Sequence, residues 1–251
     1  MIEAEVEIET RDGQMNSFVT HPEEGGPFPP VLFYMDAPGK REELHDMARR
    51  IASVGYYVVL PNLYYRRVRD FRMERTEEGM KRMFEMMSHL SNTLVVEDSE
   101  ALLRFVDGQA AARPGPVGAV GYCMSGPFVL AAAARFPERF AATASIYGAR
   151  LITDAPDSAH RTLAKIAGEV YLACAEIDRW APKEQIDELG RILAEAGVDH
   201  RIEWYPGAQH GFAFPEREGV YCKASAERHW ERLFALFARK LTASAAPPAT
   251  R

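Results

Sequence analysis

A cysteine flanked by small residues constrains the fold of this chain more than any other feature. Residues 121–126 join an apolar run at 117–120 to a helix-forming run at 127–134. A strand that turns at once into a helix needs small neighbours, and it holds the side chain of the turn residue at the top of a sheet. That residue is Cys123, so the pattern predicts a nucleophile elbow that presents a thiol.

Apolar runs alternate with amphipathic segments through the rest of the chain. We expect further strands near 31–35, 56–60, 142–147, 170–175 and 201–205, and helices near 44–51, 76–108 with a break at Ser91-Asn92, 186–196 and 230–241. Continuous apolar runs are typical of strands buried on both faces. Strands that alternate with helices predict an α/β fold, with a mostly parallel central sheet and helices on both faces.

The two ends of the chain differ from this pattern. Residues 2–9 and 15–20 flank a turn at 11–13, which predicts an N-terminal antiparallel hairpin. The end of the chain is rich in Ala and Pro and is typical of a disordered tail. We therefore expect one domain over 1–243 and a disordered tail over 244–251.

Composition narrows the classes of partner and compartment. The 251 residues carry a net charge of −6, which argues against nucleic acid and anionic membranes as partners. There is no apolar run of about 18 residues, as a membrane span requires, and the acidic N-terminus does not resemble a signal peptide. The three cysteines show no paired spacing. We expect a cytoplasmic protein with free thiols, and leave its oligomeric state open.

A thiol at an elbow needs a base, and the chain offers partners in a suitable order. Asp178 follows the 170–175 strand and His210 follows the last strand. Elbow enzymes place nucleophile, acid and histidine in this order, and α/β sheets bind ligands at the carboxyl ends of their strands. Each residue also has a structural interpretation: Cys123 as a core residue, Asp178 as a turn residue. Glu176 competes with Asp178 as the acid.

Other chemical motifs are missing. No zinc-type spacing of His and Cys, no dinucleotide-binding glycine pattern and no phosphate-binding loop is present, so we expect no metal and no cofactor. One basic cluster follows the second parallel strand, and it is either a solvated loop face or a source of one arginine for an anionic substrate. Its members are Arg66, Arg67, Arg69, Arg72 and Arg75.

Over roughly residues 10–240 the chain resembles the dienelactone hydrolase family, which has the α/β-hydrolase fold. The resemblance rests on residues 121–123, Tyr147-Gly148, Asp178, residues 210–212 and residues 61–64. It implies a small-molecule ester or lactone as substrate. It also implies a catalytic triad in which Cys123 is the nucleophile, His210 the general base and acid, and Asp178 the orienting carboxylate.

The chain departs from the family pattern at three places. Asp36 stands where the family has a glutamate close to the thiol, and it is one methylene shorter. Ser125 replaces a glycine two residues after the cysteine, but serine is small enough for the turn. The family arginine that holds a substrate carboxylate is replaced by apolar residues at 211–214, and Arg217 lies slightly further on. The fold and triad therefore carry over better than the dienelactone substrate does.

The proposed chemistry predicts further site residues. The backbone N–H groups of Met124 and Ala37 are expected to stabilise the oxyanion. Aromatic residues are expected to line an apolar substrate pocket, although core packing is the default for each; they are Tyr64, Tyr122, Trp180 and Phe212, with Phe214 as a further candidate.

Two other classes of function stay open at this point. One is a non-catalytic small-molecule binding protein that uses the pocket of a hydrolase fold, because fold alone does not determine function. The other is a thiol redox sensor built on Cys123, for which Cys174 or Cys222 would have to lie nearby in space.

Overall fold

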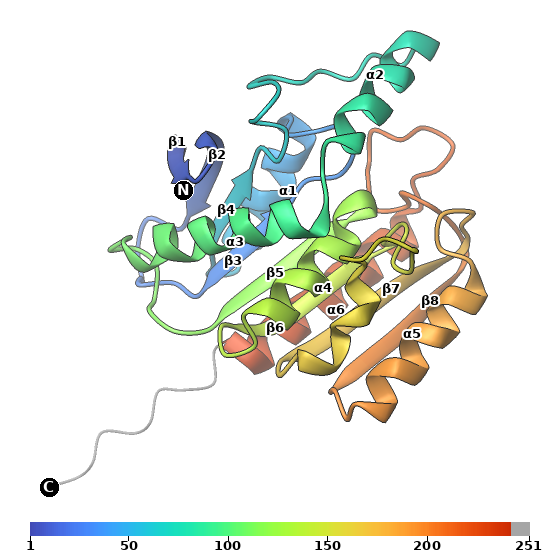
Figure 1. Cartoon of the computed structure of the whole chain (residues 1–251). Coiled ribbons are helices and arrows are strands. Elements are labelled where there is room, and N and C mark those ends of the chain that lie inside the picture. Colours follow the sequence, from blue (N-terminus) through green and yellow to red (C-terminus); the bar gives the residue numbers. More distant parts are fainter. Residues whose placement is uncertain (242–251) are drawn as a thin grey trace, which may run out of the picture.

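The computed structural model describes residues 1–241, and the tail predicted at 244–251 lies outside them. Within the described residues, one sheet has the strand order β1-β2-β4-β3-β5-β6-β7-β8 (Figure 1). The strands are β1 Ile2–Thr10, β2 Gly13–His21, β3 Pro30–Tyr34, β4 Tyr57–Pro61, β5 Val117–Tyr122, β6 Phe140–Ile146, β7 Glu169–Ile177 and β8 His200–Gln209. Strands β3 to β8 are parallel, and β1 and β2 form an antiparallel hairpin at one edge. The predicted α/β fold is confirmed.

Helices cover both faces of the sheet. Helices α3 (Asn92–Asp107), α4 (Gly126–Arg135) and α5 (Lys183–Glu195) lie on one face, and α1 (Glu42–Ala52) and α6 (Lys223–Leu241) lie on the other (Figure 1). Helix α2 (Glu77–Ser88) stands at the end of the molecule, beyond the carboxyl ends of the strands. The break expected at Ser91 is present because the Ser91 hydroxyl accepts a hydrogen bond from the Leu94 N–H and begins α3.

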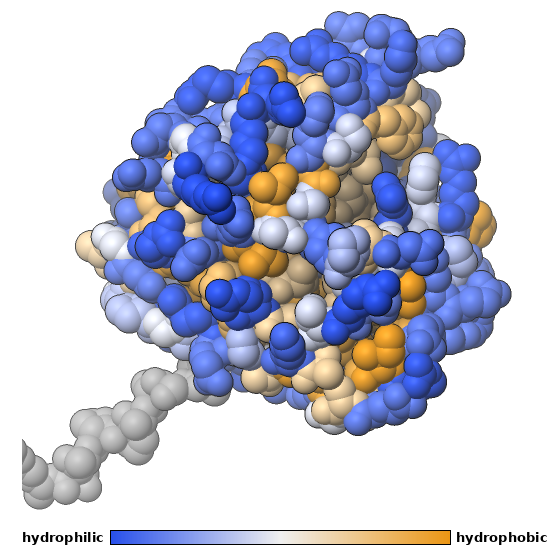
Figure 2. Space-filling model, viewed as in Figure 1, coloured by the Kyte–Doolittle hydropathy of each residue, from blue (hydrophilic) through white to orange (hydrophobic). Residues whose placement is uncertain are grey.

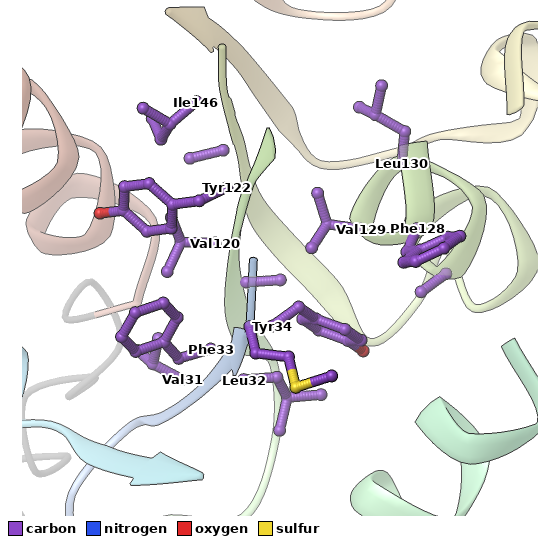
Figure 3. Packing of buried hydrophobic residues seen from close by; sticks show 14 of the residues in the cluster. Val31, Leu32, Phe33, Tyr34, Val120, Tyr122, Phe128, Val129, Leu130 and Ile146 are labelled. Atoms are coloured by element: carbon purple, nitrogen blue, oxygen red, sulfur yellow. The ribbon is translucent and has the colours of Figure 1, made fainter. Parts of the chain in front are cut away.

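The core is centred where β3 and β5 lie side by side. Every residue of β3, β4 and β5 is buried, as expected for parallel strands covered on both faces. Figure 3 shows the alternation of side chains along these strands. Tyr34 points towards Val129 of α4, whereas Phe33 and Tyr122 lie on the opposite face of the sheet. This packing fixes the ends of β3 and β5, from which the candidate site is built.

Candidate active site

Cys123 occupies the sharp turn that was predicted between β5 and α4. Its φ is +54°, a left-handed conformation that a non-glycine residue adopts only where the surroundings impose it. The turn closes because its neighbours are small: a Cβ atom on Gly121 would clash with the Ser125 carbonyl, and one on Gly126 would clash with Gly148. Ser125 is buried and its hydroxyl donates to the Met35 carbonyl, 2.5 Å away, which fastens the turn to the loop after β3.

The loop after β3 lies beside this turn because β3 and β5 are paired in parallel. The strand order changes direction at β3, and such a switch point opens a crevice at the carboxyl ends of the strands. The Tyr64 hydroxyl donates to the Ala37 carbonyl over 2.8 Å and lies 3.4 Å from the Met124 sulfur. Tyr64 thus connects the two loops that carry the predicted oxyanion donors.

His210 and Asp178 meet across the ends of β8 and β7. The His210 Nδ1 lies 2.7 Å from Asp178 Oδ2, and the other carboxylate oxygen of Asp178 accepts from the Trp180 N–H over 2.8 Å. The Asp178 carboxylate is almost fully buried. An imidazole held at Nδ1 in this way directs Nε2 elsewhere, and Nε2 is buried without a hydrogen-bond partner among the described residues.

The electrostatics around His210 favour its protonated form. Burial lowers the pKa of His210, but the hydrogen bond with Asp178 and the nearby Cys123 sulfur outweigh this effect and raise the pKa to about 9. At neutral pH the His210 imidazole therefore favours its protonated form. A positive charge of this kind beside a cysteine favours the thiolate, which is the nucleophilic form of that residue type.

The structure shows which of the two candidate carboxylates, Glu176 and Asp178, contacts His210. Glu176 is exposed and accepts a hydrogen bond from the Gly207 N–H over 2.6 Å, whereas Asp178 faces the imidazole. The pairing of β7 with β8 is irregular between Ala175 and Ile177. An irregularity of this kind re-aims the following side chains, which is how residues two positions apart come to differ in role.

Asp36 is fully buried and pairs with two arginines. Its carboxylate accepts from Arg41 over 2.5 Å and from Arg217 over 2.7 Å. Arg217 also lies over the Phe214 ring, with its guanidinium carbon 4.5 Å from the ring centroid. Arg217, whose direction the sequence left open, thus points inward and is held against Asp36.

A cavity of about 1600 Å³ opens over these residues. Its lining includes Cys123, Met124, Ala37, His210 and Trp180. It brings the thiol, the imidazole, both predicted oxyanion residues and one predicted substrate-binding aromatic to a common space. Such a concave site beside reactive groups is typical of small-molecule binding.

The other aromatic residues predicted to bind substrate lie in the core instead of lining this cavity. Tyr122 is the last residue of β5, its side chain alternates to the far face of the sheet, and its hydroxyl lies 2.9 Å from His229 Nε2. Phe212 is buried and stacks on Tyr205, with ring centroids 4.8 Å apart. Tyr64 is buried behind Ala37 and Met124 and supports the site from beneath.

Tyr147 is buried beside His210, and sequence reasoning gave it no role. Its φ is +36°, its ring meets the His210 ring edge to face at 5.2 Å, and its buried hydroxyl has no hydrogen-bond partner among the described residues. Burial raises the pKa of Tyr147 well above its ordinary value, so the hydroxyl stays protonated. Tyr147 followed by Gly148 was visible in the sequence, but a positive φ at an aromatic residue has no local signature.

Most of the basic cluster forms ion pairs. Arg66 binds Asp98 and Asp12, Arg69 binds Glu7, and Arg72 binds Asp70. Arg69, Arg72 and Arg75 line the cavity, whereas Arg67 does not and lies 3.3 Å from His89 Nδ1. Arg66 is therefore structural, and the three cavity-lining arginines leave the anion-binding alternative open.

The described residues bear on metal binding, membrane insertion and disulfide formation. Among residues 1–241 no set of three or more His, Cys, Asp or Glu side chains is arranged to hold a metal ion. In the same range, none of the helices has the length and apolar character that crossing a membrane requires. The cysteines Cys123, Cys174 and Cys222 are all free.

Comparison with known proteins places the chain among hydrolases. The model of the dienelactone hydrolase family matches residues 15–241. A Synechocystis sp. protein provisionally named carboxymethylenebutenolidase is 28% identical over 239 residues, which cover 94% of this chain and 96% of the relative. The carboxymethylenebutenolidase of Rhodococcus opacus is 29% identical over 223 residues, with 86% and 83% covered.

Solved structures agree on the fold. A crystal structure from Klebsiella pneumoniae, provisionally named a dienelactone hydrolase, superposes with a TM-score of 0.84 at 23% identity and covers 95% of this chain and 98% of that one. The dienelactone hydrolase of Anabaena variabilis gives a TM-score of 0.69 at 18% identity, with 96% and 98% covered. The α/β-hydrolase architecture expected from the sequence is confirmed.

Proposed function

This chain belongs to the dienelactone hydrolase family and hydrolyses esters or lactones, and we propose that it does so through a Cys123–His210–Asp178 triad. The observation that carries the proposal is the 2.7 Å contact between His210 Nδ1 and Asp178 Oδ2 beside a thiol at an elbow. Asp178 holds the ring so that Nε2 serves the sulfur and the substrate.

In the first half of the reaction the Cys123 thiolate attacks the carbonyl carbon and forms a C–S bond. The N–H groups of Met124 and Ala37 stabilise the oxyanion, and one such donor is typically worth about 3 kcal/mol of barrier. The C–O bond to the leaving group then breaks, and the alkoxide takes the proton of the His210 imidazolium. The products of this half are a thioester on Cys123 and a neutral His210.

In the second half His210 accepts a proton from water, and the hydroxide attacks the thioester carbonyl. The C–S bond breaks, and the acid and the Cys123 thiolate are released beside the imidazolium. A lactone keeps its leaving group tethered to the acyl part, so it yields one hydroxy acid. Thiolates expel amines poorly, which favours esters, lactones and thioesters over peptides as substrates.

The test is hydrolysis of p-nitrophenyl acetate, a simple lactone and a dienelactone by the wild type, Cys123→Ala and Cys222→Ala. We expect turnover to fall at least about a thousandfold in Cys123→Ala. We expect it to persist in Cys222→Ala, which removes a thiol outside the cavity. Undiminished hydrolysis in Cys123→Ala would exclude this nucleophile. Saturable binding of a lactone without turnover by the wild type would instead favour a binding protein.

A further inference from the structure

One face of helix α2 is apolar and borders the cavity that contains the thiol. Met80, Met83, Phe84 and Met87 all line the cavity, and their spacing of three and four residues puts them on one side of the helix. Lys81 and Glu85, which follow Met80 and Phe84 in the sequence, do not line it. We call the four residues the methionine face.

The methionine face is poorly covered by the protein itself. Met83 is the one buried residue of α2, while Met80 and Phe84 are 41% and 42% exposed. Exposed large apolar side chains that gather at a cavity mark a binding surface more often than isolated ones do. Figure 2 shows apolar residues exposed among the hydrophilic ones on this side of the molecule, below the end that α2 forms.

Other apolar side chains of the cavity lining adjoin the methionine face. Trp180 is 36% exposed, and its ring lies 6.3 Å from the Phe84 ring, centroid to centroid. Trp180 is also two residues from Asp178 and donates its N–H to that carboxylate. Phe71 and Phe128 line the same cavity from the body of the protein. The cavity lining thus includes apolar side chains both on α2 and next to the triad residue Asp178, among charged residues such as Arg72 and Arg179.

We propose that the methionine face and Trp180 bind an extended apolar group of the substrate, so that esters or lactones with a long alkyl or a bulky aromatic part are preferred over small ones. This rests on the proposed function. Ligand pockets for drug-sized molecules have volumes of about 300–1,000 Å³, whereas this cavity has about 1600 Å³, more than a small lactone fills. Methionine side chains are flexible and adapt to varied apolar shapes.

The position of α2 explains how such a group would be bound. The group would cover surface that water now contacts at Met80 and Phe84, and burial of each methylene is worth about 0.8 kcal/mol, or about fourfold in affinity. Such a gain in binding energy increases kcat/KM, because it lowers the free energy of the transition state relative to that of the free enzyme and substrate.

The experiment compares p-nitrophenyl acetate with p-nitrophenyl octanoate, and ethyl acetate with octyl acetate, in the wild type, Phe84→Ala and Glu85→Ala. In the wild type we expect kcat/KM to be at least about tenfold higher for the longer member of at least one pair. Phe84→Ala should reduce that ratio about fivefold or more. Glu85→Ala, on the same helix but outside the cavity, should retain it. Neither substitution removes a buried side chain.

Two results would overturn the proposal while leaving the hydrolase intact. One is an equal kcat/KM for both members of both pairs, and the other is a ratio that Phe84→Ala does not change. Sedimentation provides a third: a wild-type dimer that Phe84→Asp converts to monomer would show that a second copy covers the methionine face.

If no ester is hydrolysed, the proposed function fails, and calorimetry decides the binding proposal separately. Titration of octanoate into the wild type should give saturable binding with a negative heat-capacity change, which Phe84→Ala weakens and acetate does not reproduce. Absence of octanoate binding in that case would overturn the proposal.

Discussion

Helices α4 and α2 both border the cavity that contains the thiol, yet they differ in how deeply they are buried. Residues 126–134 of α4 are all buried, and the N-terminus of the helix is fixed by the turn at Cys123. In α2 only Met83 is buried. In the proposed mechanism the reacting sulfur thus lies on the part of the fold that tolerates least change, whereas the proposed substrate-binding face of α2 is loosely supported. This arrangement would assign the reaction to a rigid element and substrate selection to a less buried one.

We expect the largest effect from a substitution at Asp178, among the buried residues around the thiol. Asp178→Asn should lower kcat for ester hydrolysis by about 10³–10⁴-fold, as for other buried triad aspartates, because the imidazole loses its orienting anion. The pH profile should change as well. His210 has a pKa of about 9 and must be protonated to release the alkoxide, so wild-type kcat/KM should fall as pH rises through about 9.

In Asp178→Asn the alkaline limb of this profile should move to lower pH, since the carboxylate that raises the pKa of His210 is gone. The measurement is kcat/KM between pH 6 and 10 for both proteins, with Glu176→Gln as the matched control on the neighbouring carboxylate. If the alkaline limb stays in place in Asp178→Asn, or moves equally in Glu176→Gln, Asp178 is not the carboxylate that raises the pKa of His210.

A pair of truncations tests the contrast in stability directly. Leu130→Ala in α4 removes a fully buried side chain and should lower the free energy of unfolding by about 3 kcal/mol. Met80→Ala in α2 removes a similar volume from a position that is largely open to water, and should cost less than about 1 kcal/mol. Urea unfolding of both variants gives the two values, and equal costs would show that α2 is held more firmly than its burial indicates.

The smallest expected effect concerns Tyr147. Its hydroxyl has no hydrogen-bond partner within residues 1–241, so Tyr147→Phe should change the free energy of unfolding by less than about 1 kcal/mol, while the edge-to-face contact of its ring with His210 is kept. We expect kcat/KM for p-nitrophenyl acetate to change by less than about threefold. A fall of more than tenfold, with stability unchanged, would sharpen the comparison by showing that this hydroxyl takes part in the reaction.

Patterns along the chain predicted most of the fold, because helices and strands depend largely on residues that are close together in the sequence. Buried parallel strands appear in the sequence as continuous apolar runs, and the sequence predicted the break at Ser91-Asn92, where the structure shows that Ser91 caps α3. The pocket was harder to predict. An aromatic residue next to the elbow faces the core or the cavity according to the alternation of its strand, and Tyr122 at the end of β5 faces the core. The apolar face of α2 could not be distinguished in the sequence from one that packs on the sheet.

By itself the sequence determined the turn at Cys123, since only small residues at Gly121 and Gly126 let a strand pass so sharply into a helix. It also determined the order in which thiol, carboxylate and imidazole follow one another. Only the tertiary structure decided that Asp178, and not Glu176, faces His210, and that Asp36 is held by Arg41 and Arg217. The physical reason is that backbone sterics act between neighbours in the chain. The meeting of two side chains depends instead on strand register and loop path, to which residues far apart in sequence contribute.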